Sequence, residues 1–113
     1  MWARAMVVEL PPVEIARRLR EAPDGLLLVD VREPTERQFA SIAPSVHIPM
    51  QQIPSRVAQL PRDREIVVFC HTGVRSAMVA AYLEHQGFPR VANLTGGIDA
   101  WSRSVDPRVP RYA

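Results

Sequence analysis

Two continuous apolar runs constrain the fold of this 113-residue chain more than any other feature. The first spans Leu26 to Val31 and contains one acid, Asp30, and the second spans Ile66 to Cys70. Runs of this length without polar alternation are typical of strands that are covered on both faces, as in parallel sheets. The chain is therefore predicted to form a sheet that lies between layers of helices.

Helical patterns alternate with the strand patterns along the chain. Further strands are predicted at Met6–Glu9, Val46–Ile48 and Val91–Leu94. Helices are predicted to begin at Pro11, Glu33 and Pro54, and to span Ser76–Gln86 and Gly97–Ser102. This alternation predicts the α/β class, with a mostly parallel sheet of about five strands and helices on both faces. Ligands of such sheets bind at the carboxyl ends of strands, which here are Asp30–Arg32 and Cys70–Thr72.

Length, charge and cysteine content limit the class of protein. The length fits one compact domain over residues 1–113. The net charge is only +2 and Arg alternates with Glu, so no nucleic-acid partner is expected. One cysteine excludes an internal disulfide and agrees with a reducing compartment. Met1–Leu10 lacks a signal-peptide pattern and no apolar run reaches roughly 18 residues, which predicts a cytoplasmic protein without a membrane partner.

The loop after the second apolar run carries the pattern most typical of catalysis. Cys70 ends the strand, Gly73 follows three positions later, and a helix is predicted from Ser76. Glycine permits a sharp turn that aims successive backbone N–H groups at one point, and a helix N-terminus adds positive charge. Such a cradle binds anions and favours thiolate, a nucleophile toward sulfur. A lone cysteine at a strand end is more often structural, but the whole loop pattern favours the catalytic interpretation.

Several segments resemble a known family in the right order. Cys70 to Ser76 resembles the active-site loop of rhodanese-like sulfurtransferases, which reads Cys, two residues, Gly, one residue, Arg, then Ser or Thr. Other similar segments are Leu28–Pro34, His47–Pro49, Leu94–Trp101 and the tail Val105–Tyr112. The tail is similar to that of single-domain bacterial members and of rhodanese domains fused to adenylyltransferases that activate sulfur-carrier proteins. The resemblance covers about Val8 to Tyr112 and implies the three-layer rhodanese-like fold.

The resemblance also implies a reaction. Cys70 would take the outer sulfur of thiosulfate or a similar donor as a persulfide and pass it to a thiol or cyanide. The residues implied to bind the substrate through the loop are His71, Thr72, Gly73, Val74, Arg75 and Ser76. Because the chain has no second cysteine, the acceptor is an external thiol or a sulfur-carrier protein. No cofactor is expected, and the three histidines are too dispersed for a metal site.

Some alternatives stay open at the level of sequence. The domain is also interpretable as a delivery module for one sulfur carrier or as a non-catalytic docking module. A phosphatase or arsenate reductase of this fold needs five residues between Cys and Arg, whereas four separate Cys70 from Arg75. Arg75 either binds the substrate anion or braces the loop, and His71 is open as a general base. Asp30 and Arg32 are predicted to form a structural ion-pair network beneath the loop.

Overall fold

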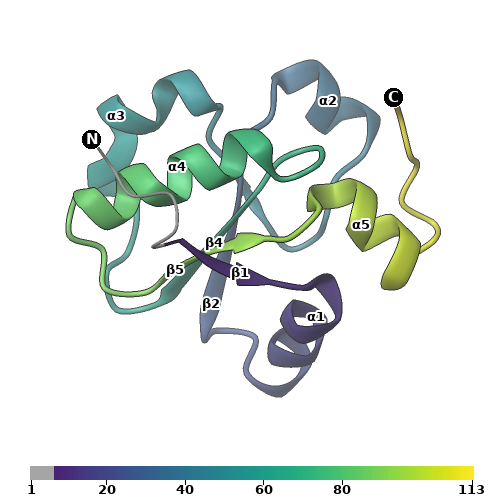
Figure 1. Cartoon of the computed structure of the whole chain (residues 1–113), viewed down its shortest axis with the longest axis horizontal. Coiled ribbons are helices and arrows are strands. Elements are labelled where there is room, and N and C mark those ends of the chain that lie inside the picture. The colour runs from purple at the N-terminus through teal and green to yellow at the C-terminus, as the bar shows by residue number, and fades with distance from the viewer. Residues whose placement is uncertain (1–6) are drawn as a thin grey trace.

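A five-stranded sheet forms the centre of the computed structural model, which describes residues 7–113 (Figure 1). The strands are β1 (Val8–Leu10), β2 (Leu26–Asp30), β3 (Val46–His47), β4 (Glu65–Phe69) and β5 (Val91–Leu94). Their spatial order is β1-β5-β4-β2-β3 and every pair is parallel, which confirms the predicted sheet. Met6, predicted to open the first strand, lies outside the described residues. Because β2 and β4 are neighbours, with Asp30 opposite Phe69, their carboxyl ends meet at one edge.

Helices cover both faces of the sheet, as the sequence predicts. The helices are α1 (Pro12–Glu21), α2 (Pro34–Phe39), α3 (Ile53–Arg56), α4 (Val74–His85) and α5 (Gly97–Ser104). Short 3-10 turns, η2 (Met50–Gln52) and η3 (Val57–Gln59), flank α3. In Figure 1, α1 and α5 lie on one side of the strands and α3 and α4 on the other. None of the helices in the described part of the chain is long and apolar enough to cross a membrane.

The start of α4 differs from the prediction by two residues. The sequence predicts a helix from Ser76, whereas the helix begins at Val74. Gly73 precedes it with φ of +106°, a left-handed conformation that L side chains rarely adopt, so the chain turns directly into the helix. The first-turn amides therefore come from Val74, Arg75 and Ser76, closer to Cys70 than expected.

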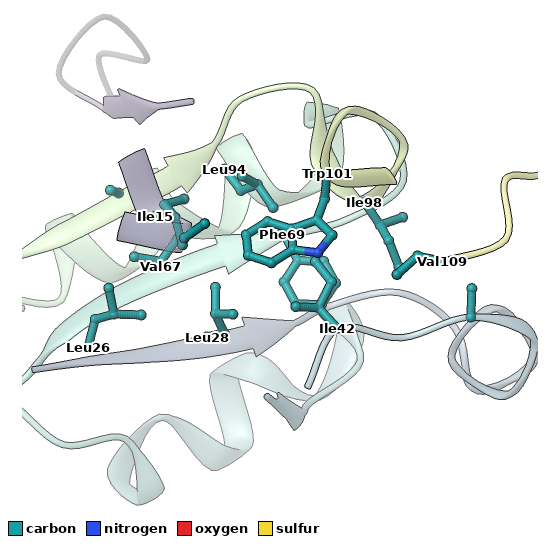
Figure 2. Packing of buried hydrophobic residues seen from close by; sticks show 13 residues of the cluster. Ile15, Leu26, Leu28, Ile42, Val67, Phe69, Leu94, Ile98, Trp101 and Val109 are labelled. Atoms are coloured by element: carbon teal, nitrogen blue, oxygen red, sulfur yellow. The ribbon is translucent and has the colours of Figure 1, made fainter. Parts of the chain in front are cut away.

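Successive side chains of β4 point to opposite faces of the sheet, and the core accordingly has two halves. Val67 and Phe69 point toward the cluster that contains α1 and α5. In Figure 2 the indole of Trp101 lies beside the ring of Phe69, and Trp101 is buried, so it packs as part of this cluster. Val68 and Cys70 point toward the other cluster, which includes the buried side of α4. The thiol of Cys70 therefore lies on the side of the sheet that α4 covers.

Close packing fixes α4 on the sheet. Ala80 is fully buried and Ala81 is nearly so, and small side chains allow a helix to approach strands closely. Ala77, Val79 and Leu83 are also buried, as expected for a helix that is apolar on most sides. The rigid helix holds its first turn, and with it Ser76, in a constant position above the end of β4.

Candidate active site

Three hydrogen-bond donors surround the sulfur of Cys70. Cys70 is the first residue after β4, and its Sγ accepts from the backbone N of Gly73 at 3.1 Å. Ser76 donates twice, from its backbone N at 3.4 Å and from its Oγ at 3.2 Å. The residue is 1% exposed, so the thiol is buried against polar hydrogens rather than apolar groups alone. Such a ring of donors favours a negatively charged sulfur.

The amino end of α4 adds to the positive field at the sulfur. Ser76 lies in the first helical turn, where backbone N–H groups have no partner within the helix. One of these groups is directed at Sγ, and the helix dipole places partial positive charge at the same end. Backbone groups of the local fold therefore stabilise an anion at Cys70, and the Arg75 guanidinium adds a Coulombic attraction to charge at the sulfur.

Asn93 holds the turn at Gly73 from below. Its Nδ2 donates to the Gly73 carbonyl at 3.1 Å and to Oε2 of Glu9 at 3.0 Å. Asn93 belongs to β5 and is 2% exposed, so the sheet itself anchors the turn. The Gly73 amide that contacts the sulfur belongs to the same residue, and its direction depends on this anchor.

The amino end of α5 holds the base of the loop. The backbone N of Ile98 donates to the Cys70 carbonyl at 2.9 Å, and the N of Asp99 donates to the His71 carbonyl at 3.1 Å. Gly97 passes between these groups, where a Cβ would stand 2.5 Å from the Cys70 carbonyl oxygen. Only glycine allows the helix to approach the loop this closely, and its φ of +63° also favours glycine.

Gly97→Ala is expected to destabilise the protein by about 2–4 kcal/mol, because it combines a left-handed backbone with an overpacked contact. Gly87→Ala is the matched control, since Gly87 has φ of +89° but a Cβ there would meet only a flexible arginine end at 3.5 Å. Urea denaturation of the two variants checks this. If the two variants lose equal stability, the close contact of a Cβ at position 97 with the Cys70 loop does not destabilise the protein.

Arg75 braces the loop against α2. Its Nη1 and Nη2 donate to the two carboxylate oxygens of Glu36 at 2.7 and 2.9 Å. The Arg75 guanidinium holds the pKa of Glu36 down at about 2, and Glu36 in turn raises the pKa of Arg75. Of the two roles that the sequence leaves open for Arg75, these contacts support bracing.

Glu36→Gln is expected to lower stability mainly near neutral pH. The carboxyl pKa falls from 4.5 to about 2 on folding, so its contribution is complete above pH 4.5 and is lost as the pH falls through about 2. The difference in unfolding free energy between wild type and variant should be about 2–3 kcal/mol at pH 6 and much smaller at pH 2.5. Urea denaturation at both pH values measures it, with the exposed Asp24→Asn as control. A difference that does not change with pH would contradict the assignment.

The side chain of His71 is held by the carboxyl-terminal tail. Its Nε2 lies 2.8 Å from the Tyr112 carbonyl, and its ring stacks on the Tyr112 ring at 4.0 Å and 11°. Because a carbonyl only accepts, Nε2 donates and does not act as a base in this arrangement. Thr72 and Val74 are exposed at the mouth of the loop, where Val74 is 60% accessible.

Beneath the loop, Asp30 and Arg32 form the predicted ion-pair network with both side chains fully buried. Nε and Nη2 of Arg32 donate to the two carboxylate oxygens of Asp30 at 2.9 and 2.8 Å. The remaining donors reach the carbonyls of Glu36 and Ala40 and the Tyr112 hydroxyl, so all five N–H groups are used. This complete pairing confirms the structural role predicted for the two residues.

Sequence reasoning did not identify every residue that shapes the site. It assigned no role to Glu36, Asn93 or Tyr112, which hold Arg75, Gly73 and His71 from distant elements. The sequence gives only a positional signal for two of them: Glu36 lies four residues after Arg32, and Tyr112 ends the tail that resembles the family. Contacts between segments this far apart in sequence follow from the packing of the sheet and not from local patterns.

The comparisons agree with this geometry. The family model for the rhodanese-like domain matches residues 12–104. A sulfurtransferase of Allochromatium vinosum is 43% identical over 104 residues, covering 92% of this chain and 96% of its own. The thiosulfate sulfurtransferase GlpE of Pseudomonas syringae is 39% identical over 90 residues, covering 80% and 83%.

Two further matches extend the comparison to a carrier-type relative and to a solved structure. The putative sulfur carrier protein YrkF of Bacillus subtilis is 34% identical over 94 residues, covering 83% of this chain and 51% of its own. The crystal structure of a rhodanese-like domain protein from Staphylococcus aureus superposes with a TM-score of 0.80 at 29% identity, covering 95% of this chain and 100% of that one. The chain therefore belongs to the rhodanese-like family, together with its sulfurtransferase relatives.

Proposed function

We propose that residues 1–113 form one domain that transfers sulfane sulfur through a persulfide on Cys70. The observation that carries the proposal is the ring of donors from Gly73 and Ser76 around Sγ, at 3.1 to 3.4 Å. These donors stabilise the thiolate that begins the reaction and the anionic sulfur that follows it. The relatives that are named sulfurtransferases support the same reaction class.

In the first half-reaction the Cys70 thiolate attacks the outer sulfur of thiosulfate or a similar donor. A new S–S bond forms at Sγ while the S–S bond of thiosulfate breaks, and sulfite leaves with the electron pair. The terminal sulfur then carries the negative charge, about 2.0 Å beyond Sγ. The backbone N–H groups from His71 to Ser76 would hold this sulfur, as they line the turn and the first turn of α4.

In the second half-reaction an external nucleophile removes the terminal sulfur. Cyanide forms a bond to that sulfur and leaves as thiocyanate, or a thiolate takes it and becomes a persulfide itself. In both cases the S–S bond at Cys70 breaks, and the electron pair returns to Sγ as thiolate. The chain has no second cysteine, so no resolving thiol comes from the same chain.

Intact-mass measurement after incubation with thiosulfate tests the proposal. One added sulfur atom is expected on the protein, and cyanide should remove it with release of one equivalent of thiocyanate. An unchanged mass with thiosulfate and with a low-molecular-weight persulfide would contradict it and favour a docking module. Hydrolysis of an aryl phosphate without any sulfur adduct would instead favour the phosphatase alternative.

A sulfur-carrier protein is the second candidate for the acceptor. One relative is named a putative sulfur carrier protein, and the loop is bordered by apolar surface. Val74 and Met78 lie one turn apart on α4 and are 60% and 46% exposed, so a protein that approaches the loop meets apolar side chains.

Val74→Ser and Met78→Ser should then slow transfer to a protein acceptor while transfer to cyanide is unchanged. Equal slowing with both acceptors would contradict a protein-specific surface.

A further inference from the structure

The carboxyl-terminal tail reaches the Cys70 loop from the far end of the chain. It leaves α5 and runs up toward α2 in Figure 1. The tail is fixed along its length: Val109 is buried, its carbonyl accepts from Ser102 Oγ at 2.6 Å, and Arg111 donates to Asp99 at 2.9 Å. Tyr112 is therefore delivered to the loop by a segment with a defined path.

Tyr112 contacts the loop with its backbone and its ring. Its carbonyl accepts from Nε2 of His71 at 2.8 Å, and its ring stacks on the imidazole at 4.0 Å. The edge of Phe39 in α2 supports the ring, at 5.7 Å between centroids and 78° between planes. The side chain of the residue next to Cys70 is thus held between the tail and α2.

The hydroxyl of Tyr112 connects the loop to the buried network below it. It donates to Oε2 of Glu36 at 2.7 Å and accepts from Nη1 of Arg32 at 3.0 Å. Burial raises the pKa of Tyr112 to about 12, so the hydroxyl keeps the proton that it donates. Glu36 also pairs with Arg75. Tyr112 is therefore connected to both sides of the loop, directly to His71 and through Glu36 to Arg75.

We propose that Tyr112 is a positioning residue that keeps the Cys70 loop in its donor-ring geometry by holding His71 and the Arg75–Glu36 pair. The role builds on the proposed sulfur transfer but concerns loop geometry, which is measurable without it. His71 and Arg75 flank Gly73, whose amide contacts Sγ at 3.1 Å. Loss of both ties allows this turn to open, and misplacement of about 1 Å at a reacting group costs up to roughly 100-fold in rate.

Two variants separate the contributions of Tyr112. Tyr112→Phe removes the hydroxyl contacts with Glu36 and Arg32 but keeps the ring stack and the carbonyl. Tyr112→Leu removes the stack as well. Arg108→Gln is the matched control, because it removes an exposed pair with Asp106 in the same tail and leaves the contacts of Tyr112 intact.

Hydrogen exchange gives a readout independent of sulfur transfer. In Tyr112→Leu the amides of Gly73 and Ser76 should exchange about tenfold or more faster, while the buried strand amide of Val67 exchanges as in wild type. Tyr112→Phe should show an intermediate effect and Arg108→Gln none. Equal acceleration at Gly73 and Val67 would indicate global destabilisation, and no acceleration at Gly73 would equally overturn the positioning role.

Kinetics of persulfide formation complete the test. The rate constant at saturating thiosulfate should fall about tenfold or more in Tyr112→Leu and less in Tyr112→Phe, in the same order as the exchange rates. If exchange changes as expected but wild type forms no persulfide, the proposed function fails and the positioning of the loop stands. If wild type is active and both variants keep its rate constant, the positioning role fails alone.

Discussion

Cys70→Ser is expected to abolish sulfur transfer completely while the fold persists. A serine hydroxyl would meet the same donors, the amides of Gly73 and Ser76 at 3.1 and 3.4 Å from the present sulfur position. Those donors satisfy the new oxygen, so the change in unfolding free energy should stay within about 1.5 kcal/mol. A neutral hydroxyl is not a nucleophile toward sulfur at neutral pH and forms no persulfide. The thiosulfate:cyanide assay should therefore give only the uncatalysed rate.

Ser76→Ala is the matched variant in the same ring. It removes the Oγ donor at 3.2 Å but keeps the thiol and both amides, so activity should fall by about tenfold rather than disappear. Circular dichroism and urea denaturation confirm that each variant is folded before its rate is compared. Residual transfer by Cys70→Ser above the uncatalysed rate would refute the persulfide on this residue. Complete loss in Ser76→Ala with normal stability would show that the hydroxyl does more than donate to the sulfur.

The parts of this structure that the sequence predicted depend on local patterns. The apolar runs Leu26–Val31 and Ile66–Cys70 had no polar alternation, and β2 and β4 are indeed covered on both faces and adjacent. Proline and glycine marked most element ends, because each restricts or permits particular backbone angles. The turn at Gly73 was predicted for the same reason, although its left-handed φ starts α4 two residues earlier than the periodicity suggested.

The parts that were not predicted depend on contacts between distant segments. Glu36 is 39 residues from Arg75, and Tyr112 is 41 residues from His71. No periodicity relates such pairs, since the parallel sheet and the path of the tail bring them together. Arg75 illustrates the consequence: its loop position allowed either anion binding or bracing, and the contacts that support bracing come from Glu36 in α2. The chemistry of the loop could thus be predicted from the local sequence. The distant residues that hold the loop in place could not.

Arg32→Met is expected to destabilise the protein by about 3–5 kcal/mol, because it leaves the Asp30 carboxylate without its main partner in a buried site. Both side chains are fully buried, and Arg32 donates to both carboxylate oxygens of Asp30 at 2.9 and 2.8 Å. Arg37 remains 3.3 Å from Asp30, half-buried, and compensates only in part. Urea denaturation at neutral pH measures the loss. Arg108→Met, in the exposed pair with Asp106, is the control and should leave the urea midpoint unchanged.

A double-mutant cycle with Asp30→Leu then separates the cost of an unpaired charge from the value of the pair. Each single variant leaves one buried charge, whereas Asp30→Leu with Arg32→Met leaves none, so the double variant should be more stable than either single one. The Arg32→Met variant and the double variant both lose the hydrogen bond from Arg32 to the Tyr112 hydroxyl at 3.0 Å. The loss of this contact therefore does not affect the comparison of their stabilities. Additive losses would mean that the two side chains stabilise the loop edge independently. An Arg32→Met variant as stable as wild type would mean that Arg37 alone balances Asp30.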